Sequence, residues 1–174
     1  MNKKIITVFG SSLPKAGEPE YEIAFELGKQ LALNGFDVCS GGYQGIMDAV
    51  SKGAASVGGK AIGVTVDLFN AIPSKYLTSE IKCDTLFERI DKLITTGDAY
   101  IVLPGGTGTM VELSLVWEMM NKSLTEIKPI VCFGEMWKKI VSEMETRTKL
   151  EKRTTGLVKC VNSINECIEL IKTN

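Results

Sequence analysis

Short apolar runs alternate with longer amphipathic stretches along the chain, and this pattern predicts alternating strands and helices. Strands are predicted at 5–9, 36–39, 61–66, 81–83, 99–103, 129–133 and 157–161, and helices at 20–34, 46–57, 86–96, 109–121, 136–146 and 164–172. The stretch 67–80 has no clear period and contains Pro73, so it is predicted to be a loop. Continuously apolar strands are typical of a parallel sheet covered on both faces. We therefore expect an α/β fold, a Rossmann-like doubly wound sandwich with a mostly parallel sheet of six to seven strands, formed by a single domain over residues 1–174.

Composition and charge narrow the class of protein. Hydrophobic residues make up 44% and charged residues 24% of the chain, as in ordinary globular domains. The net charge is -1, from 20 basic and 21 acidic residues, so there is no basic excess of the kind that favours a nucleic-acid partner. No apolar run is long enough to cross a bilayer and no signal peptide is visible, so we expect no membrane partner and a cytoplasmic location.

The chain has no histidine, which excludes Ser–His and Cys–His nucleophile pairs and histidine metal ligands. Its five cysteines show no CxxC spacing, so neither a zinc site nor a disulfide framework is indicated. We expect no metal ion and no organic cofactor.

Ligands of doubly wound sheets bind beyond the carboxyl ends of the strands, so the loops that follow strands are the candidate sites. The strongest signal is the segment 104–112, PGGTGTMVE, which joins a predicted strand to a predicted helix. Its glycines allow close backbone approach, and a helix start offers free N–H groups to an anion. No Gly-Lys-Ser/Thr follows, and Val111 replaces the third glycine of the dinucleotide fingerprint. The segment therefore predicts a phosphate site of another type, although a tight turn without a ligand has the same pattern.

Two charged residues are the candidate chemical groups. Glu112 lies in the first turn of a predicted helix whose neighbouring residues are apolar on nearly every side. It is either a catalytic carboxylate beside the phosphate or a residue that only favours the helix dipole. Arg89 lies in the first half of the preceding helix, which begins at the same edge of the sheet. It either faces the same crevice or forms a surface ion pair with Glu88 or Asp91.

The segment 104–112 resembles the PGGxGTxxE signature of the LOG-type proteins, many of which carry the label "possible lysine decarboxylase". VFGSS at 8–12, GGYQGIMDAV at 41–50, IGV at 62–64, FERIDKLITTGDAYIVLPGG at 87–106 and KPIV at 128–131 follow in the order of that family. The resemblance covers roughly residues 4–140. It implies a Rossmann-like fold, usually dimeric, and phosphoribohydrolase activity on nucleoside 5′-monophosphates such as AMP or cytokinin ribotides.

The resemblance also implies roles for residues. The functional glutamate of the family falls on Glu112 and the functional arginine on Arg89, and the position after the arginine, often lysine in the family, is Ile90. We expect Arg89 and Glu112 to be catalytic. Phosphate-binding residues are expected at Gly105, Gly106, Thr107, Gly108 and Thr109, and further nucleotide-binding residues at Gly10, Ser11, Ser12, Gly41, Gly42, Gly45 and Met47.

The alternative functions are lysine decarboxylation, nucleotide carriage and nucleotide sensing. Lysine decarboxylation needs a Schiff-base lysine and usually a histidine that stacks on the pyridoxal ring, and the chain has no histidine. A non-catalytic nucleotide carrier, similar to the molybdenum cofactor carriers of this fold, remains the alternative, and a nucleotide sensor is a third. We also expect a homodimer, because one small domain can hardly bury the apolar helix from Met110 to Met120 completely.

Overall fold

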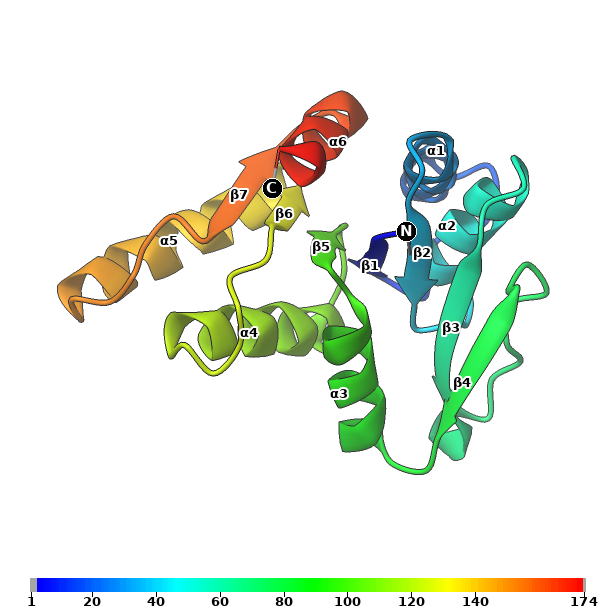
Figure 1. Cartoon of the computed structure of the whole chain (residues 1–174), viewed down its shortest axis with the longest axis horizontal. Coiled ribbons are helices and arrows are strands. Elements are labelled where there is room, and N and C mark those ends of the chain that lie inside the picture. The colour runs from blue at the N-terminus through cyan, green and yellow to red at the C-terminus, as the bar shows by residue number, and fades with distance from the viewer. Residues whose placement is uncertain (1–2, 174) are drawn as a thin grey trace.

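The computed structural model describes residues 3–173 and has a seven-stranded parallel sheet with the strand order β4-β3-β2-β1-β5-β6-β7 (Figure 1). The strands are β1 (Ile5–Phe9), β2 (Asp37–Ser40), β3 (Ala61–Val66), β4 (Ser79–Cys83), β5 (Ala99–Val102), β6 (Ile130–Phe133) and β7 (Val158–Val161). The helices are α1 (Pro19–Leu33), α2 (Ile46–Ala55), α3 (Leu86–Thr96), α4 (Thr107–Asn121), α5 (Glu135–Leu150) and α6 (Ile164–Lys172), with a 3-10 turn η1 (Asp67–Phe69). The predicted Rossmann-like α/β fold is confirmed.

The apolar core forms two layers, one on each face of the sheet. Helices α1, α2 and α6 cover one face, and α3, α4 and α5 cover the other (Figure 1). Strands β1 and β5 lie in the middle of the sheet with helices over both faces, which explains their nearly unbroken apolar sequences. No helix within residues 3–173 is long and apolar enough to span a membrane.

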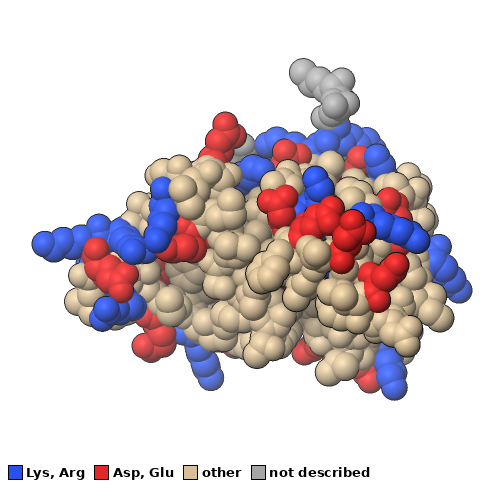
Figure 2. Space-filling view, turned by 90° about the horizontal axis from the view of Figure 1, so that it is seen from below, with Lys and Arg blue, Asp and Glu red and all other residues tan. Residues whose placement is uncertain are grey.

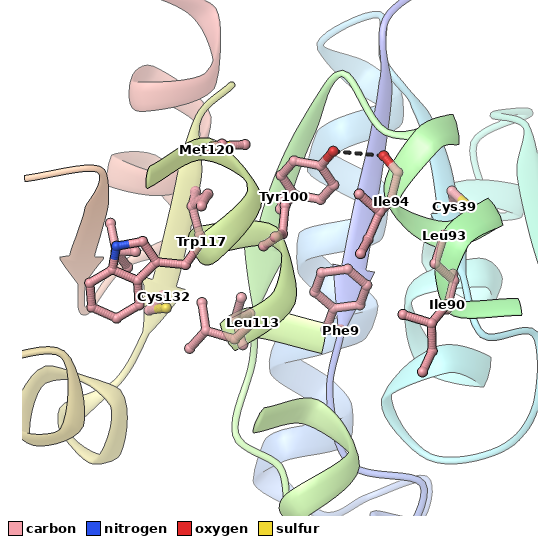
Figure 3. Close-up of a cluster of buried hydrophobic side chains, with 14 of the residues drawn as sticks. Phe9, Cys39, Ile90, Leu93, Ile94, Tyr100, Leu113, Trp117, Met120 and Cys132 are labelled. Atoms are coloured by element: carbon pink, nitrogen blue, oxygen red, sulfur yellow. Dashed lines mark hydrogen bonds between the residues drawn. The ribbon is translucent and has the colours of Figure 1, made fainter. Parts of the chain in front are cut away.

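The layer under α3 and α4 fixes the centre of the sheet to these helices. Phe9 and Tyr100, from adjacent strands, stack with ring centroids 6.0 Å apart. The Tyr100 hydroxyl donates a hydrogen bond of 2.7 Å to the carbonyl oxygen of Ile94 near the end of α3 (Figure 3). Thr7 donates to the Leu93 carbonyl at 3.1 Å. These buried bonds hold α3, and hence its N-terminal turn, in a defined position against β1 and β5.

Several element boundaries differ from the predictions by two residues or more, among them the end of α5, which lies at Leu150 rather than at 146. The segment 67–80 is not wholly a loop, because η1 begins at Asp67 and β4 begins at Ser79 rather than at Ile81. Strand β4 is an edge strand with mostly exposed side chains, so its first residues are polar and lack an apolar signal. Helix α4 begins at Thr107 rather than Thr109. Two of the predicted loop residues therefore belong to its first turn.

Candidate functional site

A hollow of about 360 Å³ lies beyond the carboxyl ends of β1 and β5, where the strand order reverses direction. This is the position at which doubly wound folds bind ligands, and the volume falls in the range of small-molecule sites. We call it the switch-point hollow. Its lining residues come from the β1 loop, α2, α3 and the start of α4: Gly10, Ser11, Ser12, Leu13, Met47, Arg89, Gly106, Thr107, Gly108, Thr109 and Glu112.

Backbone hydrogen bonds join the two loops that form the floor of the hollow. The amide of Ser11 donates to the carbonyl oxygen of Pro104 at 3.0 Å, and the carbonyl oxygen of Ser11 accepts from the amide of Ile46 at 2.9 Å. The β1 loop is therefore connected both to the glycine-rich loop and to the first residue of α2. This connection fixes the floor before any ligand binds.

The N-terminus of α4 is the candidate anion-binding element of the hollow. Its N-cap residue is Gly106, and no side chain caps the helix, so the first amides are not satisfied by the protein. A Cβ atom added at Gly106 or Gly108 would meet nothing within 4 Å, so the space above the loop is open. Free amides and the helix dipole together favour a phosphate or carboxylate at this point.

Gly105 has a different function from its two neighbours. A Cβ atom at this position would overlap the Thr109 hydroxyl oxygen, so only glycine lets the loop fold back onto the first turn of α4. Thr109 is itself buried, whereas Thr107 is exposed. The two threonines predicted as phosphate ligands thus differ, one lying at the open rim of the hollow and one in its wall.

Arg89 is buried, with only 6% of its surface exposed, and is held by main-chain oxygen atoms. Its Nε donates to the Val64 carbonyl at 2.8 Å and one Nη to the Gly41 carbonyl at 3.1 Å. The rings of Tyr43 and Phe69 lie 5.7 and 5.5 Å from the guanidinium carbon. The carbonyl dipoles and the aromatic ring faces offset part of the free-energy cost of burying the guanidinium, which keeps its positive charge. Its other Nη makes no hydrogen bond to residues 3–173 and is free for a ligand.

Gly41 is required by the position of Arg89. A Cβ atom on Gly41 would overlap the terminal nitrogen of the guanidinium and come within 2.6 Å of the Met47 sulfur. The glycine pair that the sequence suggested as nucleotide contacts is buried, and neither Gly41 nor Gly42 lines the hollow. Gly41 instead makes room for the arginine that does.

Glu112 faces the same hollow one turn beyond the start of α4. Its carboxylate is half-buried and forms no hydrogen bond or ion pair within residues 3–173. Burial raises the pKa of Glu112 to about 7, while the nearby positive charge of Arg89 opposes the rise. Burial lowers the pKa of Arg89, and Glu112 counteracts that effect. The two groups act on each other electrostatically without direct contact, so a ligand can lie between them.

The structure brings together most of the predicted site residues. Gly10, Ser11, Ser12, Met47, Arg89, Gly106, Thr107, Gly108, Thr109 and Glu112 line the hollow. Gly45 borders a neighbouring pocket instead, and its φ of 69° is a left-handed conformation that suits glycine.

Two aromatic residues beside the hollow, Tyr43 and Phe69, were not predicted from the sequence as site residues. Tyr43 lies inside the GGYQG segment, where its aromatic ring was the available signal, whereas Phe69 lies in the stretch expected to be featureless.

Ile90, which follows the candidate arginine, belongs to the core and not to the hollow. Only 8% of its surface is exposed, and it packs with Leu93 and Ile94 beneath α3 (Figure 3). Consecutive helix residues point in directions about 100° apart, which places Arg89 in the hollow and Ile90 in the apolar layer. The side chain of Ile90 therefore does not line the hollow.

Fold and site together define an α/β protein in which an uncapped helix start, a buried arginine and a half-buried glutamate surround one hollow. The chain belongs to the SLOG cluster4 family, whose sequence pattern matches residues 3–167. It is similar to the cytokinin riboside 5′-monophosphate phosphoribohydrolase of Rhodococcoides fascians, with 30% identity over 148 residues, 82% of this chain and 74% of the relative. The protein of the same name from Mycobacterium tuberculosis is 35% identical over 99 residues, 55% of this chain and about half (53%) of the relative.

Among solved structures, the molybdenum cofactor binding protein of Rippkaea orientalis has the same fold over nearly the whole chain. The TM-score is 0.78 and the sequence identity 26%, covering 99% of this chain and 98% of the other. The sequence relatives are thus named as hydrolases, and this structural neighbour is named for binding a cofactor. The LOG-type resemblance is confirmed, and the relatives support a hydrolase.

Proposed function

We propose that this protein hydrolyses the N-glycosidic bond of nucleoside 5′-monophosphates and releases the free base and ribose 5-phosphate. One observation carries the proposal: a buried arginine and a half-buried carboxylate face one hollow above an uncapped helix start. The hydrolase names of the relatives support the same reaction. AMP and cytokinin ribotides are the substrates that we propose to test first.

The 5′-phosphate is expected to bind at the first turn of α4. The open amides around Gly106 and Gly108, with the Thr107 hydroxyl, offer several donors to its oxygen atoms. The phosphate lies far from the bond that breaks, so its binding energy serves to position the ribose. The β1 loop, through Ser11 and Ser12, is expected to contact the ribose or base.

Glu112 is expected to act at the anomeric carbon C1′. As the bond between C1′ and the base nitrogen breaks, the electron pair leaves with the base and positive charge develops on the ribose. An ionised carboxylate stabilises that charge, and it accepts a proton from the water that attacks C1′. The proton then passes to the departing base. A carboxyl with a pKa of about 7 suits this exchange of protons near neutral pH.

Arg89 is expected to hold the substrate with its free Nη. Because two carbonyl groups and two aromatic rings already fix the guanidinium, little conformational entropy is lost when it binds a phosphate or ribose hydroxyl. The arginine also keeps part of the Glu112 population ionised, since its charge opposes the effect of burial.

The proposal is tested by incubating the protein with a panel of nucleoside monophosphates and measuring free base. We expect Glu112→Gln and Arg89→Ala each to lower kcat/KM by at least about 100-fold. Matched controls are Glu118→Gln, on the same helix but in a surface ion pair with Lys122, and Lys92→Ala, on the exposed side of α3. Hydrolysis that is unaffected by the first two changes would refute the assigned roles.

The second candidate is a carrier that binds a phosphorylated ligand without hydrolysing it. It is favoured by the likeness to the Rippkaea orientalis protein over almost the entire chain. The same hollow and helix start would serve both functions. Tight nucleotide binding without release of base from any member of the panel would favour the carrier over the hydrolase.

We also propose that two copies of the chain associate through α3 and α4. Side chains of Leu86, Phe87, Val111 and Leu115 are exposed on these helices, with Phe87 85% exposed. Figure 2 views the side on which α3 and α4 lie and shows a broad area without charged side chains across its middle. Exposed apolar side chains on neighbouring helices are typical of subunit interfaces. Sedimentation at micromolar concentration should show a dimer that Val111→Lys dissociates, and a monomeric parent protein would remove the proposal.

A further inference from the structure

Two of the five cysteines lie opposite each other on neighbouring strands at the edge of the sheet. Cys132 of β6 pairs in register with Cys160 of β7, the last strand of the sheet. Both side chains pack in the apolar layer covered by α3, α4 and α5, in which Figure 3 shows Cys132. Both are free thiols. Neither lines the switch-point hollow, so the pair has no part in the proposed hydrolysis.

The pairing of the strands brings the two sulfur atoms close to each other. Neighbouring strands lie about 4.7–4.9 Å apart, and the Cα atoms of disulfide-bonded cysteines are usually about 4.4–6.8 Å apart. The Cys132 thiol donates a hydrogen bond to the sulfur of Cys160, so the two sulfur atoms already face each other. Because β7 is an edge strand, a small shift of its backbone disturbs no strand beyond it. A disulfide between Cys132 and Cys160 therefore needs only a local adjustment.

The two thiols differ in exposure, and this difference assigns their roles. Cys132 is fully buried, whereas Cys160 is partly exposed. The hydrogen bond from Cys132 and the positive charge of Lys138 lower the pKa of Cys160, while burial and the carboxylates of Glu135 and Glu145 oppose this effect. Reactive cysteines are typically thiolates that are partly exposed and lie near a cation. Cys160 is therefore the nucleophile, and Cys132 is the second thiol.

The other three cysteines differ from this pair. Cys39 and Cys83 lie opposite residues other than cysteine in the sheet. Cys167 is on α6, in the layer on the other face. Burial raises the pKa of Cys39 and of Cys167 to about 12 and also raises that of Cys83. These three thiols are expected to be unreactive in the folded protein.

We propose that Cys160 and Cys132 form a redox-sensitive dithiol that a hydroperoxide oxidises to a disulfide. The Cys160 thiolate attacks the peroxide, so an S–O bond forms as the O–O bond breaks, and the released hydroxide takes a proton from solvent and becomes water. The Cys132 thiol then loses its proton and attacks the sulfur of Cys160. The S–S bond forms, the S–O bond breaks, and the departing hydroxide leaves with the Cys132 proton as a second water. The sulfur atoms are oxidised and the peroxide is reduced, and the new bond ties β6 to β7 across the segment that contains α5.

Treatment of the folded full chain with hydrogen peroxide tests the proposal. The protein is then unfolded, its free thiols are alkylated with N-ethylmaleimide, and its peptides are mapped by mass spectrometry. The parent protein should lose two of its five alkylatable thiols, with the peptides of Cys132 and Cys160 joined, and dithiothreitol should restore both. Cys132→Ala should instead hold Cys160 as a sulfenic acid, which dimedone captures, and Cys160→Ala should leave Cys132 reduced. The matched control Cys83→Ala should form the disulfide as the parent protein does.

Labelling of the folded, reduced protein with iodoacetamide tests the assigned order of the two thiols. Cys160 should be alkylated at least about tenfold faster than Cys132 or Cys83. The proposal is overturned if all five thiols of the parent protein remain alkylatable after peroxide treatment, if Cys160 ends as a sulfinic acid, or if it joins a cysteine other than Cys132. These outcomes are read in the parent protein, so they do not depend on the folding of a variant. Cys160→Ala should leave nucleotide hydrolysis unchanged, so the dithiol and the hydrolase proposals are tested separately.

Discussion

Replacing Glu112 by glutamine should increase the free energy of unfolding at neutral and higher pH, and should change it little near pH 4. Burial raises the pKa of the Glu112 carboxyl from 4.5 to about 7, so the folded state binds this proton more tightly than the unfolded chain does. The folded state therefore loses stability as the pH rises from about 4.5 to about 7, and the loss is complete above that range. A pKa change of this size corresponds to about 3 kcal/mol. Glutamine has nearly the same shape and cannot ionise, so it avoids the loss.

Urea unfolding of the parent and of Glu112→Gln at about pH 4, 6 and 8 measures this effect. The two free energies of unfolding should nearly coincide at the lowest pH, and the variant should be more stable by about 3 kcal/mol at the highest. Other titrating groups are common to both proteins, so they cancel in the difference. Glu118→Gln is a control of opposite sign, because Lys122 and Arg153 lower the pKa of Glu118. A difference for Glu112→Gln that stays constant with pH would refute the burial argument.

Three further outcomes follow from the site. For the proposed hydrolase, kcat/KM should rise about tenfold per pH unit below about pH 7 and level off above it, because the reaction requires the ionised Glu112 carboxylate. A kcat/KM that is independent of pH between about 5 and 8 would contradict this expectation. Gly41→Ala should lower kcat/KM about 10- to 100-fold, because the added methyl group displaces Arg89. The double variant Gly41→Ala/Arg89→Ala should have nearly the same kcat/KM as Arg89→Ala alone, and additive losses would show that Gly41 does not act through Arg89. Thr85→Ala should reduce the free energy of unfolding by about 1 kcal/mol in urea titrations, because the Thr85 hydroxyl caps α3 by accepting from the amide of Glu88. An unchanged free energy of unfolding would contradict this role of the hydroxyl.

The hydrolase and carrier functions differ in what they require of the couple formed by Arg89 and Glu112. A carrier needs the anion-binding start of α4 but has no need for a half-buried carboxylate that destabilises the folded state. Buried ionisable groups that reduce stability are typical of functional sites, where they persist because they interact with the ligand or take part in the reaction. The gain in stability expected for Glu112→Gln would therefore support a functional use of this carboxylate.

The sequence by itself determined the order of strands and helices, and it indicated the helix start that we propose as the anion site. Apolar runs such as 99–103 are expected to be buried, and glycine-rich turns such as 104–106 are expected at strand ends, because hydrophobic periodicity and local sterics decide both. The candidate carboxylate could also be placed, since Glu112 lies near the start of the helix that follows the glycine-rich loop. These features depend on interactions between residues that are close in the sequence, so they can be predicted from it.

Only the tertiary structure decided what meets across the hollow. Arg89 is bound by the carbonyls of Val64 and Gly41, which come from other strands and loops, so neither its burial nor the true role of Gly41 can be read from spacing. The start of β4 escaped prediction because an edge strand can be polar. The raised pKa of Glu112 likewise depends on how many distant groups surround it. Burial and electrostatic coupling are properties of the assembled molecule, because they are set by residues brought together in space rather than in sequence.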